Sequence, residues 1–191
     1  MSESESNFKG PERVCPSESA GWLSTPVRTL FTNPTRILKG LVGRGGIAVD
    51  LGCGPGFFTL PLARMVGEAG RVIAVDVQPE MLAKLDARAQ KAGLASRIEL
   101  HHADPNAIGV GGPVDFVLAF WMLHEVPAKA EFLEEAHDLL KEGGRFLLVE
   151  PMGHVSKSQY LEVEGLAGQA GLTPVARPRI FLSRATLFKR P

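Results

Sequence analysis

Residues 49–58 read VDLGCGPGFF, a short apolar run that carries Asp50 and leads into a loop with three glycines. Gly52, Gly54 and Gly56 occupy alternate positions in that loop. A glycine-rich turn after the first strand of an open parallel sheet lies outside the carboxyl ends of the strands, where such sheets bind their ligands. The stretch therefore predicts an α/β sheet with a cofactor at this loop.

The spacing of the glycines separates two kinds of cofactor. A dinucleotide-binding loop reads G-x-G-x-x-G/A, with a small sixth residue that allows close packing of the helix. Here the sixth position is Phe57, and the third glycine comes one residue early. Asp50 would repel a pyrophosphate but favour an ammonium group through water or the loop amides. S-adenosylmethionine (SAM) carries an ammonium and a sulfonium and no phosphate, so the loop favours SAM over NAD.

Short β-branched runs alternate with helical patterns from Ile47 onward, which is typical of a parallel sheet flanked by helices. Five buried strands are expected, and two edge strands are expected within 173–190. Glycines 143 and 144 are expected to end the third helix. The predicted strands span 47–51, 71–76, 97–102, 114–120 and 145–150, and the helices cover 57–66, 79–92, a segment around 132–140, and 156–170.

Acidic residues mark the ends of the first three strands. Asp76, at the end of the second strand, is placed to accept hydrogen bonds from both hydroxyls of a ribose, a role common to NAD and SAM sites. Asp104 follows the third strand and is placed to accept from an adenine amine. The alternatives are a helix cap for Asp76 and a turn before Pro105 for Asp104. Together with Asp50, these acids favour a cationic adenosyl ligand.

Composition excludes several classes of partner. The 191 residues, 45% of them hydrophobic, suffice for one domain with an ordinary core. Basic and acidic residues both number 21, so no strong field attracts nucleic acid, and no apolar run reaches the length of a membrane span. Cys15 and Cys53 lack the spacing of a zinc site or a disulfide framework. A cytoplasmic protein without a metal, a nucleic-acid partner or a membrane partner is expected.

The N-terminal part differs in character from the rest. Residues 1–44 begin with a polar tip and continue with a segment rich in proline, threonine and large apolar side chains. This length is too short for a second core, so it is predicted to form a flexible tip and a flap on the acceptor side of a core at 45–191. Trp22, Leu23 and Phe31 are expected to contribute to specificity for the acceptor.

Five motifs in order, VDLGCGPGFFT, VIAVDVQPEML, HHAD, VDFVLAFWMLHEV and LLKEGGRFLLVEP, resemble those of the class I SAM-dependent methyltransferases. The resemblance covers about residues 45–191 and is closest to the small-molecule branch that includes quinone-pathway enzymes. It implies a Rossmann-like open sheet of seven strands in the order 3-2-1-4-5-7-6, with strand 7 antiparallel and helices on both faces. The cofactor-binding residues that it implies are Asp50, Gly52, Cys53, Gly54, Gly56, Asp76, Val77, Asp104, Ala119 and Phe120.

Candidate catalytic residues follow the fourth and fifth strands. His124 and Glu125 are expected to open the next helix, where His124 is placed to take a proton from a phenol or thiol acceptor. Glu150 and His154 belong to the same face of the sheet and are further candidates. Hydrogen bonds that stabilise the loops are the alternative role for all four, and a base is optional when the acceptor is already nucleophilic.

Aromatic residues at the end of the fourth strand are candidates for contact with the sulfonium. Phe120 and Trp121 are placed to stabilise it by cation–π attraction, with simple packing as the alternative. The AFWMLHEVP run stands where amino-methylating families carry an Asn-Pro-Pro-aromatic signature. This replacement disfavours an adenine or glutamine acceptor.

The function predicted from these observations is in-line transfer of a methyl group from SAM to a small-molecule acceptor, with S-adenosylhomocysteine as the product. Three alternatives stay open: a SAM-binding protein without catalysis, a methyltransferase acting on RNA or protein, and, less favoured, an NAD-dependent oxidoreductase. The sequence identifies neither the acceptor nor the oligomeric state.

Overall fold

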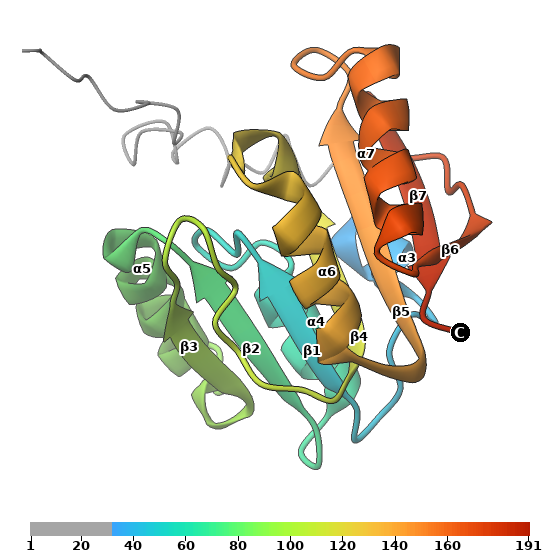
Figure 1. Cartoon of the computed structure of the whole chain (residues 1–191). Coiled ribbons are helices and arrows are strands. Elements are labelled where there is room, and N and C mark those ends of the chain that lie inside the picture. Colours follow the sequence, from blue (N-terminus) through green and yellow to red (C-terminus); the bar gives the residue numbers. More distant parts are fainter. Residues whose placement is uncertain (1–31) are drawn as a thin grey trace, which may run out of the picture.

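The computed structural model describes residues 32–191, which form one seven-stranded sheet with helices on both faces (Figure 1). The strand order is β3-β2-β1-β4-β5-β7-β6. Strands β1 to β5 pair in parallel, and β7 runs antiparallel to both of its neighbours. The predicted fold class and strand order are thereby confirmed. The strands are β1 (Ile47–Leu51), β2 (Arg71–Asp76), β3 (Ile98–His102), β4 (Val114–Phe120), β5 (Leu140–Pro151), β6 (Thr173–Ala176) and β7 (Ser183–Lys189).

The helices divide the core into two layers, one on each face of the sheet. The front layer in Figure 1 holds α6 (Lys129–Leu139) and α7 (Lys157–Gln169), and the opposite layer holds α3 (Pro34–Leu38), α4 (Thr59–Val66) and α5 (Pro79–Lys91). Alternate strand residues serve the two layers, as when Val49 packs toward α6 and Ala48 toward α4. No helix within 32–191 has the length and apolar character needed to cross a membrane.

Most of the predicted flap lies outside the described residues, including Cys15, Trp22, Leu23 and Phe31. Its described part contains α3, whose first turn is capped by the Asn33 side chain. Leu38 and Val42 are buried in the layer that also contains α4. Residues 32–44 therefore pack against the core of the domain.

Two predictions about the margins of the sheet were wrong. β3 was expected to be buried, but three of its five residues are exposed, because it is an edge strand with a single neighbour, β2. The last two strands were both expected at an edge, but only β6 is there, since β7 is inserted between β5 and β6. Pro174 lies in β6, where a missing N–H is tolerated.

The predicted ends of two helices also differ from the structure. α4 starts at Thr59 rather than at residue 57, because the glycine loop continues through Phe58. α6 ends at Leu139, and Gly143 and Gly144 lie inside β5 instead of ending the helix. The register with β4 shifts between Val114 and Phe116, so the glycines belong to an irregularity in the strand. Gly143 has a φ of 75°, which suits the local change of direction.

A buried chain of hydrogen bonds fixes α7 on β7. The Tyr160 hydroxyl donates to Thr186 Oγ1 over 3.0 Å, and Thr186 in turn donates to the carboxylate of Glu164. Arg177 completes the chain with a forked contact to Glu164, with both N–O distances at 3.3 Å. Burial raises the pKa of Tyr160 to about 12, so this hydroxyl stays protonated and acts as a donor.

Replacing Thr186 by valine is expected to lower the free energy of unfolding by about 1–3 kcal/mol, because a buried hydroxyl and a largely buried carboxylate both lose a partner while the side-chain shape is kept. Thr186 is fully buried. Urea denaturation measures the change. Thr173→Val on the exposed face of β6 is the control and should stay within about 0.5 kcal/mol of wild type. If Thr186→Val and Thr173→Val are equally stable, these hydrogen bonds make no net contribution to the free energy of unfolding.

Candidate active site

The glycine loop between β1 and α4 is held against two neighbouring elements. The Cys53 N–H donates to the Val75 carbonyl over 3.0 Å, which ties the loop to β2. Gly52 has a φ of 65°, and a Cβ built there would lie 2.8 Å from the Cβ of Met122, so the segment after β4 packs directly on the loop. The Cys53 side chain is buried and burial raises the pKa of its thiol, so Cys53 fills the turn as a neutral group.

Gly54 presents the open side of the loop. Its φ is 51°, and a Cβ built there would meet no described atom within 4 Å. Its N–H donates to Asp76 Oδ2 over 2.8 Å. The backbone at Gly54 therefore borders open space beside a carboxylate, which is a cradle that a ligand with hydroxyl or ammonium groups fits.

Asp50 and Asp76 occupy different environments. Asp50 is 2% exposed and accepts a hydrogen bond from Thr59 Oγ1 over 2.6 Å, so it ties the start of α4 to β1. Asp76 is 7% exposed and also accepts from the Gln78 N–H over 2.9 Å. Burial raises the pKa of Asp76 above its usual range. The Gly54 and Gln78 amides donate to different Asp76 oxygens, and a carboxylate can accept further bonds, as contact with ribose hydroxyls requires.

The remaining residues predicted at the adenosyl end lie beyond β2 and β3. Val77 is partly buried, and its carbonyl lies 3.1 Å from His102 Nε2. Asp104 is exposed, and its Oδ1 accepts from the Asn106 N–H over 2.9 Å. The turn considered for Asp104 is thus present. The helix cap considered for Asp76 is not, because α5 begins after Gln78.

Aromatic rings line the end of β4. Ala119 is fully buried, and the Phe120 ring packs between Phe58 and Trp121 at centroid distances of 4.3 and 5.2 Å. Trp121 has a φ of 59°, a strained conformation for a bulky residue, and its indole N–H donates to Ser183 Oγ over 3.0 Å. Strain of this kind persists where surrounding contacts over-determine the backbone, and it clusters at functional sites.

His124 and Glu150 form a close pair on the face of the sheet that α6 and α7 cover. Glu150 is 2% exposed at the end of β5, and its Oε2 lies 2.6 Å from His124 Nδ1. Its Oε1 accepts from the His124 backbone N–H over 3.1 Å. With Glu150 as the acceptor of this bond, the neutral imidazole carries its proton on Nδ1, and Nε2 keeps an available lone pair. The expected start of a helix at His124 was wrong: it lies in the 3-10 turn η3 (Leu123–Glu125), and α6 begins at Lys129.

Further polar groups surround the imidazole. The hydrogen bond that His124 donates to Glu150 raises the pKa of His124 above its ordinary value, and this effect outweighs the opposing effect of burial. Glu125 Oε1 lies 3.9 Å from Nε2. The His154 ring meets that of His124 edge to face at a centroid distance of 5.9 Å. The structure therefore brings together all four residues predicted as catalytic candidates.

These four residues line one cavity of about 520 Å³, which falls in the size range of small-molecule sites. The sequence predictions missed the part of the lining that comes from α6 and α7. The capping-box spacing at Ser156 predicted the start of α7, but it gave no indication of which helix face meets the cavity. The complete lining is His124, Glu125, Lys129, Glu150, His154, Val155, Gln159, Glu162, Val163 and Leu166.

The strand order and the glycine loop define the class of protein, because they are those of the class I SAM-dependent methyltransferases. Residues 48–144, half of the chain, match the family described as methyltransferase domain, and the chain belongs to this family. SAM, rather than NAD, is accordingly the cofactor, as predicted.

Two relatives show how far the sequence similarity extends. The chain is 31% identical over 110 residues to the ubiquinone/menaquinone biosynthesis C-methyltransferase UbiE of Enterobacter sp., a match that covers 57% of this chain and 44% of UbiE. It is 35% identical over 108 residues to an uncharacterized 37.1 kDa protein in transposon TN4556 of Streptomyces fradiae, covering 56% of this chain and 30% of that protein. The chain thus matches less than half the length of these curated relatives.

A solved structure extends the likeness of the fold to nearly the whole chain. The SAM-dependent methyltransferase from Aquifex aeolicus superposes with a TM-score of 0.83 at 24% identity. The superposition covers 93% of this chain and all of that protein. At this identity the likeness concerns the fold and leaves the acceptor open.

Proposed function

We propose that this protein transfers a methyl group from SAM to a small-molecule acceptor that loses a proton in the reaction. The observation that carries the proposal is the His124–Glu150 pair at 2.6 Å on the wall of a cavity of about 520 Å³, beside the end of β4. The size of this cavity and the C-methyltransferase activity in the name of UbiE support a small acceptor.

The cofactor site follows from the residues at the carboxyl ends of β1 to β4. We assign the methionine part to the loop at Gly52, Gly54 and Gly56, with Ala119 and Phe120 beside it. The Asp76 carboxylate would hold the ribose, and Asp104 would meet the adenine. When bound, SAM supplies the electrophilic methyl group, so the protein needs to provide alignment, exclusion of water and proton removal.

The proposed mechanism uses His124 as a base and Glu150 as the residue that orients it. Two contacts from Glu150, to Nδ1 and to the backbone N–H, fix the ring so that Nε2 accepts the proton of the acceptor. The buried carboxylate then stabilises the imidazolium that forms. Glu125, 3.9 Å from Nε2, is placed to carry that proton onward to solvent.

Thermal unfolding with SAM, S-adenosylhomocysteine, NAD and NADP tests the first step. A ligand present at 100 times its dissociation constant stabilises by about 2.7 kcal/mol, which raises the midpoint of a domain this size by about 5–10 °C. We expect a rise with both adenosyl ligands and none with NAD or NADP. A rise with the nicotinamide cofactors alone would refute the proposed reaction.

Release of S-adenosylhomocysteine then measures turnover with small phenols, thiols and carbon acids, and in parallel with RNA and a protein extract. The proposal requires turnover with a small molecule. Turnover with RNA or protein alone, or SAM binding without turnover on any acceptor, would favour an alternative function.

A further inference from the structure

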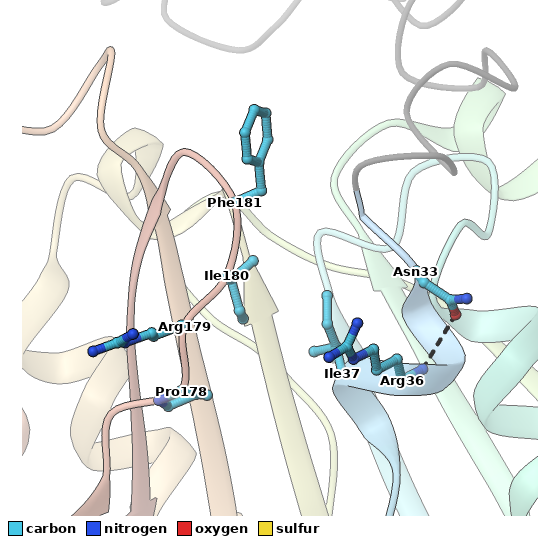
Figure 2. Close-up of a pocket in the computed structure, with 7 residues that line it drawn as sticks. All are labelled: Asn33, Arg36, Ile37, Pro178, Arg179, Ile180 and Phe181. Atoms are coloured by element: carbon cyan, nitrogen blue, oxygen red, sulfur yellow. Dashed lines mark hydrogen bonds between the residues drawn. The ribbon is translucent and has the colours of Figure 1, made fainter.

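A second cavity lies on the opposite face of the sheet from the His124–Glu150 pair. It measures about 380 Å³ and runs between α3 and the connection from β6 to β7 (Figure 2). We define it as the α3 groove, and its lining is Asn33, Arg36, Ile37, Pro178, Arg179, Ile180 and Phe181. No residue predicted as catalytic or cofactor-binding contributes to it.

The walls of the α3 groove combine apolar side chains with two cations. Ile180 is buried and Ile37 partly buried, and these two side chains lie on opposite sides of the gap in Figure 2. The lining contains two arginines and no acidic residue. Within residues 32–191, neither Arg36 nor Arg179 forms a salt bridge. A ligand with an apolar body and a negative group complements such a surface.

The two arginines are not equivalent. Figure 2 shows the Arg36 guanidinium extending from α3 toward the 178–181 segment, into the gap. The Arg179 guanidinium points to the outer side of that segment, away from α3. Arg36 is therefore placed to contact an anion directly, whereas Arg179 adds positive potential at the rim.

Hydrogen bonds preform the wall that faces Arg36. Ser183 donates its N–H to the Ile180 carbonyl and its hydroxyl to the Phe181 carbonyl, each over 3.1 Å. Met152 N–H donates to the Leu182 carbonyl over 3.0 Å. Leu182 has a φ of 49°. Within residues 32–191, Leu182 and Trp121 are the two non-glycine residues with a positive φ, and the Trp121 indole donates to Ser183. Both strained positions thus belong to the support of this wall, as expected where a binding surface is held in shape.

We propose that the α3 groove is a binding site for a small organic acid with an apolar body, whose anionic group contacts the Arg36 guanidinium. The body would lie between Ile37 and Ile180, beside Phe181. This site is separate from the cavity at His124 and does not depend on the proposed methyl transfer, so either proposal can fail without the other.

The test uses two fluorescent probes that differ only in charge. 1-Anilinonaphthalene-8-sulfonate carries a sulfonate, and N-phenyl-1-naphthylamine has the same ring system without it. With the full chain, we expect the sulfonate to bind about tenfold or more tightly than the neutral probe, and added salt to weaken only the sulfonate. Equal affinities would overturn the proposal.

Variants locate the site. Arg36→Gln is expected to weaken binding of the sulfonate by about tenfold and leave the neutral probe unchanged, while Arg36→Lys restores part of the loss. Arg179→Gln should cost less, about twofold, because its guanidinium points away from the gap. Arg64→Gln, an exposed arginine of α4 in the same layer, is the matched control and should have no effect. Equal sulfonate binding by Arg36→Gln and Arg64→Gln would also overturn the proposal.

A displacement experiment shows whether the site requires the negative group of an organic acid. 4-Phenylbutyrate should displace the sulfonate probe, and 4-phenylbutyramide should not. Mass spectrometry of the acid after incubation with SAM should show it unchanged, as expected of a ligand bound away from the methyl-transfer cavity. Methylation of the acid, or equal displacement of the sulfonate probe by the amide, would overturn the proposal.

Discussion

A His124→Ala variant is expected to bind SAM as well as the wild type and to lose about 10²- to 10⁴-fold in kcat with an acceptor that must lose a proton. The variant removes the imidazole but leaves the glycine loop and Asp76 untouched. His124 contacts Glu150 at the end of β5 and is not among the groups proposed to hold the cofactor. Loss of turnover without loss of cofactor binding therefore separates proton removal from binding.

The pH dependence of turnover gives an independent readout of the same pair. The hydrogen bond that His124 donates to Glu150 raises the pKa of His124, and the charge of Glu125 adds to this rise while Lys129 and burial oppose it. A base works only when unprotonated, so kcat should increase with pH through a value above that of an ordinary histidine. Glu150→Gln should move this rise in kcat to lower pH and reduce kcat.

The raised pKa of His124 also makes stability depend on pH. Protonation of His124 favours the folded state below pH about 6.5, and this stabilisation is lost as the pH rises through the raised pKa.

His137→Ala is the matched control for His124. His137 also has an acidic neighbour, with Nδ1 3.0 Å from Asp138 Oδ1, but it lies near the end of α6 and does not line the cavity. Its replacement should leave kcat and the pH profile unchanged. If His124→Ala keeps full kcat with a protonated phenol or thiol, His124 is not the base, and the pair serves only to hold the turn after β4.

Gly54→Ala is expected to weaken SAM binding by about 100-fold or more while the protein stays folded. The added Cβ meets no protein atom within 4 Å, so the fold has room for it. It would project into the open space beside the Gly54 N–H and the Asp76 carboxylate, where the cofactor is proposed to lie. The positive φ of 51° adds a strain of about 1–2 kcal/mol, which lowers stability but does not itself occupy the site.

Gly93→Ala separates strain from occlusion. Gly93 follows α5, has a φ of 67°, and also has no atom within 4 Å of a built Cβ. Both variants should therefore show a similar fall in unfolding midpoint. Only Gly54→Ala should lose affinity for SAM, as measured by calorimetric titration. If both variants bind SAM normally, the open side of the loop does not face the cofactor.

The sequence predicted the structure correctly where a residue pattern is compatible with only one local structure. The alternating glycines after 47–51 predicted the loop, and the apolar runs predicted the central strands, because a parallel sheet covered on both faces needs apolar side chains on both. The errors concern elements whose burial or secondary structure depends on their tertiary surroundings. β3 has strand-like residues but lies at an edge, and Gly143 and Gly144 serve an irregular strand although they suit a helix end equally well.

The candidate site was predicted as a list of residues rather than as a geometry. The contact between His124 and Glu150 joins residues 26 positions apart and depends on the alignment of β4 with β5, which no local pattern encodes. The burial of Asp50 likewise depends on where α4 begins. The α3 groove was missed altogether, because it joins residues 33–37 to 178–181 and neither segment carries a motif.

The insertion of β7 between β5 and β6 has an evolutionary consequence. The start of β7 lies where the parallel strands have their carboxyl ends, and Ser183 pairs there with Pro151, the last residue of β5. The proposed cofactor residues come mostly from a contiguous stretch, 50–104, whereas the 178–182 connection and the β5 end come from the last third of the chain. If the α3 groove binds an organic acid as proposed, changes in length or composition at 178–182 would alter the preferred ligand and leave the segment that encodes the proposed cofactor site unchanged.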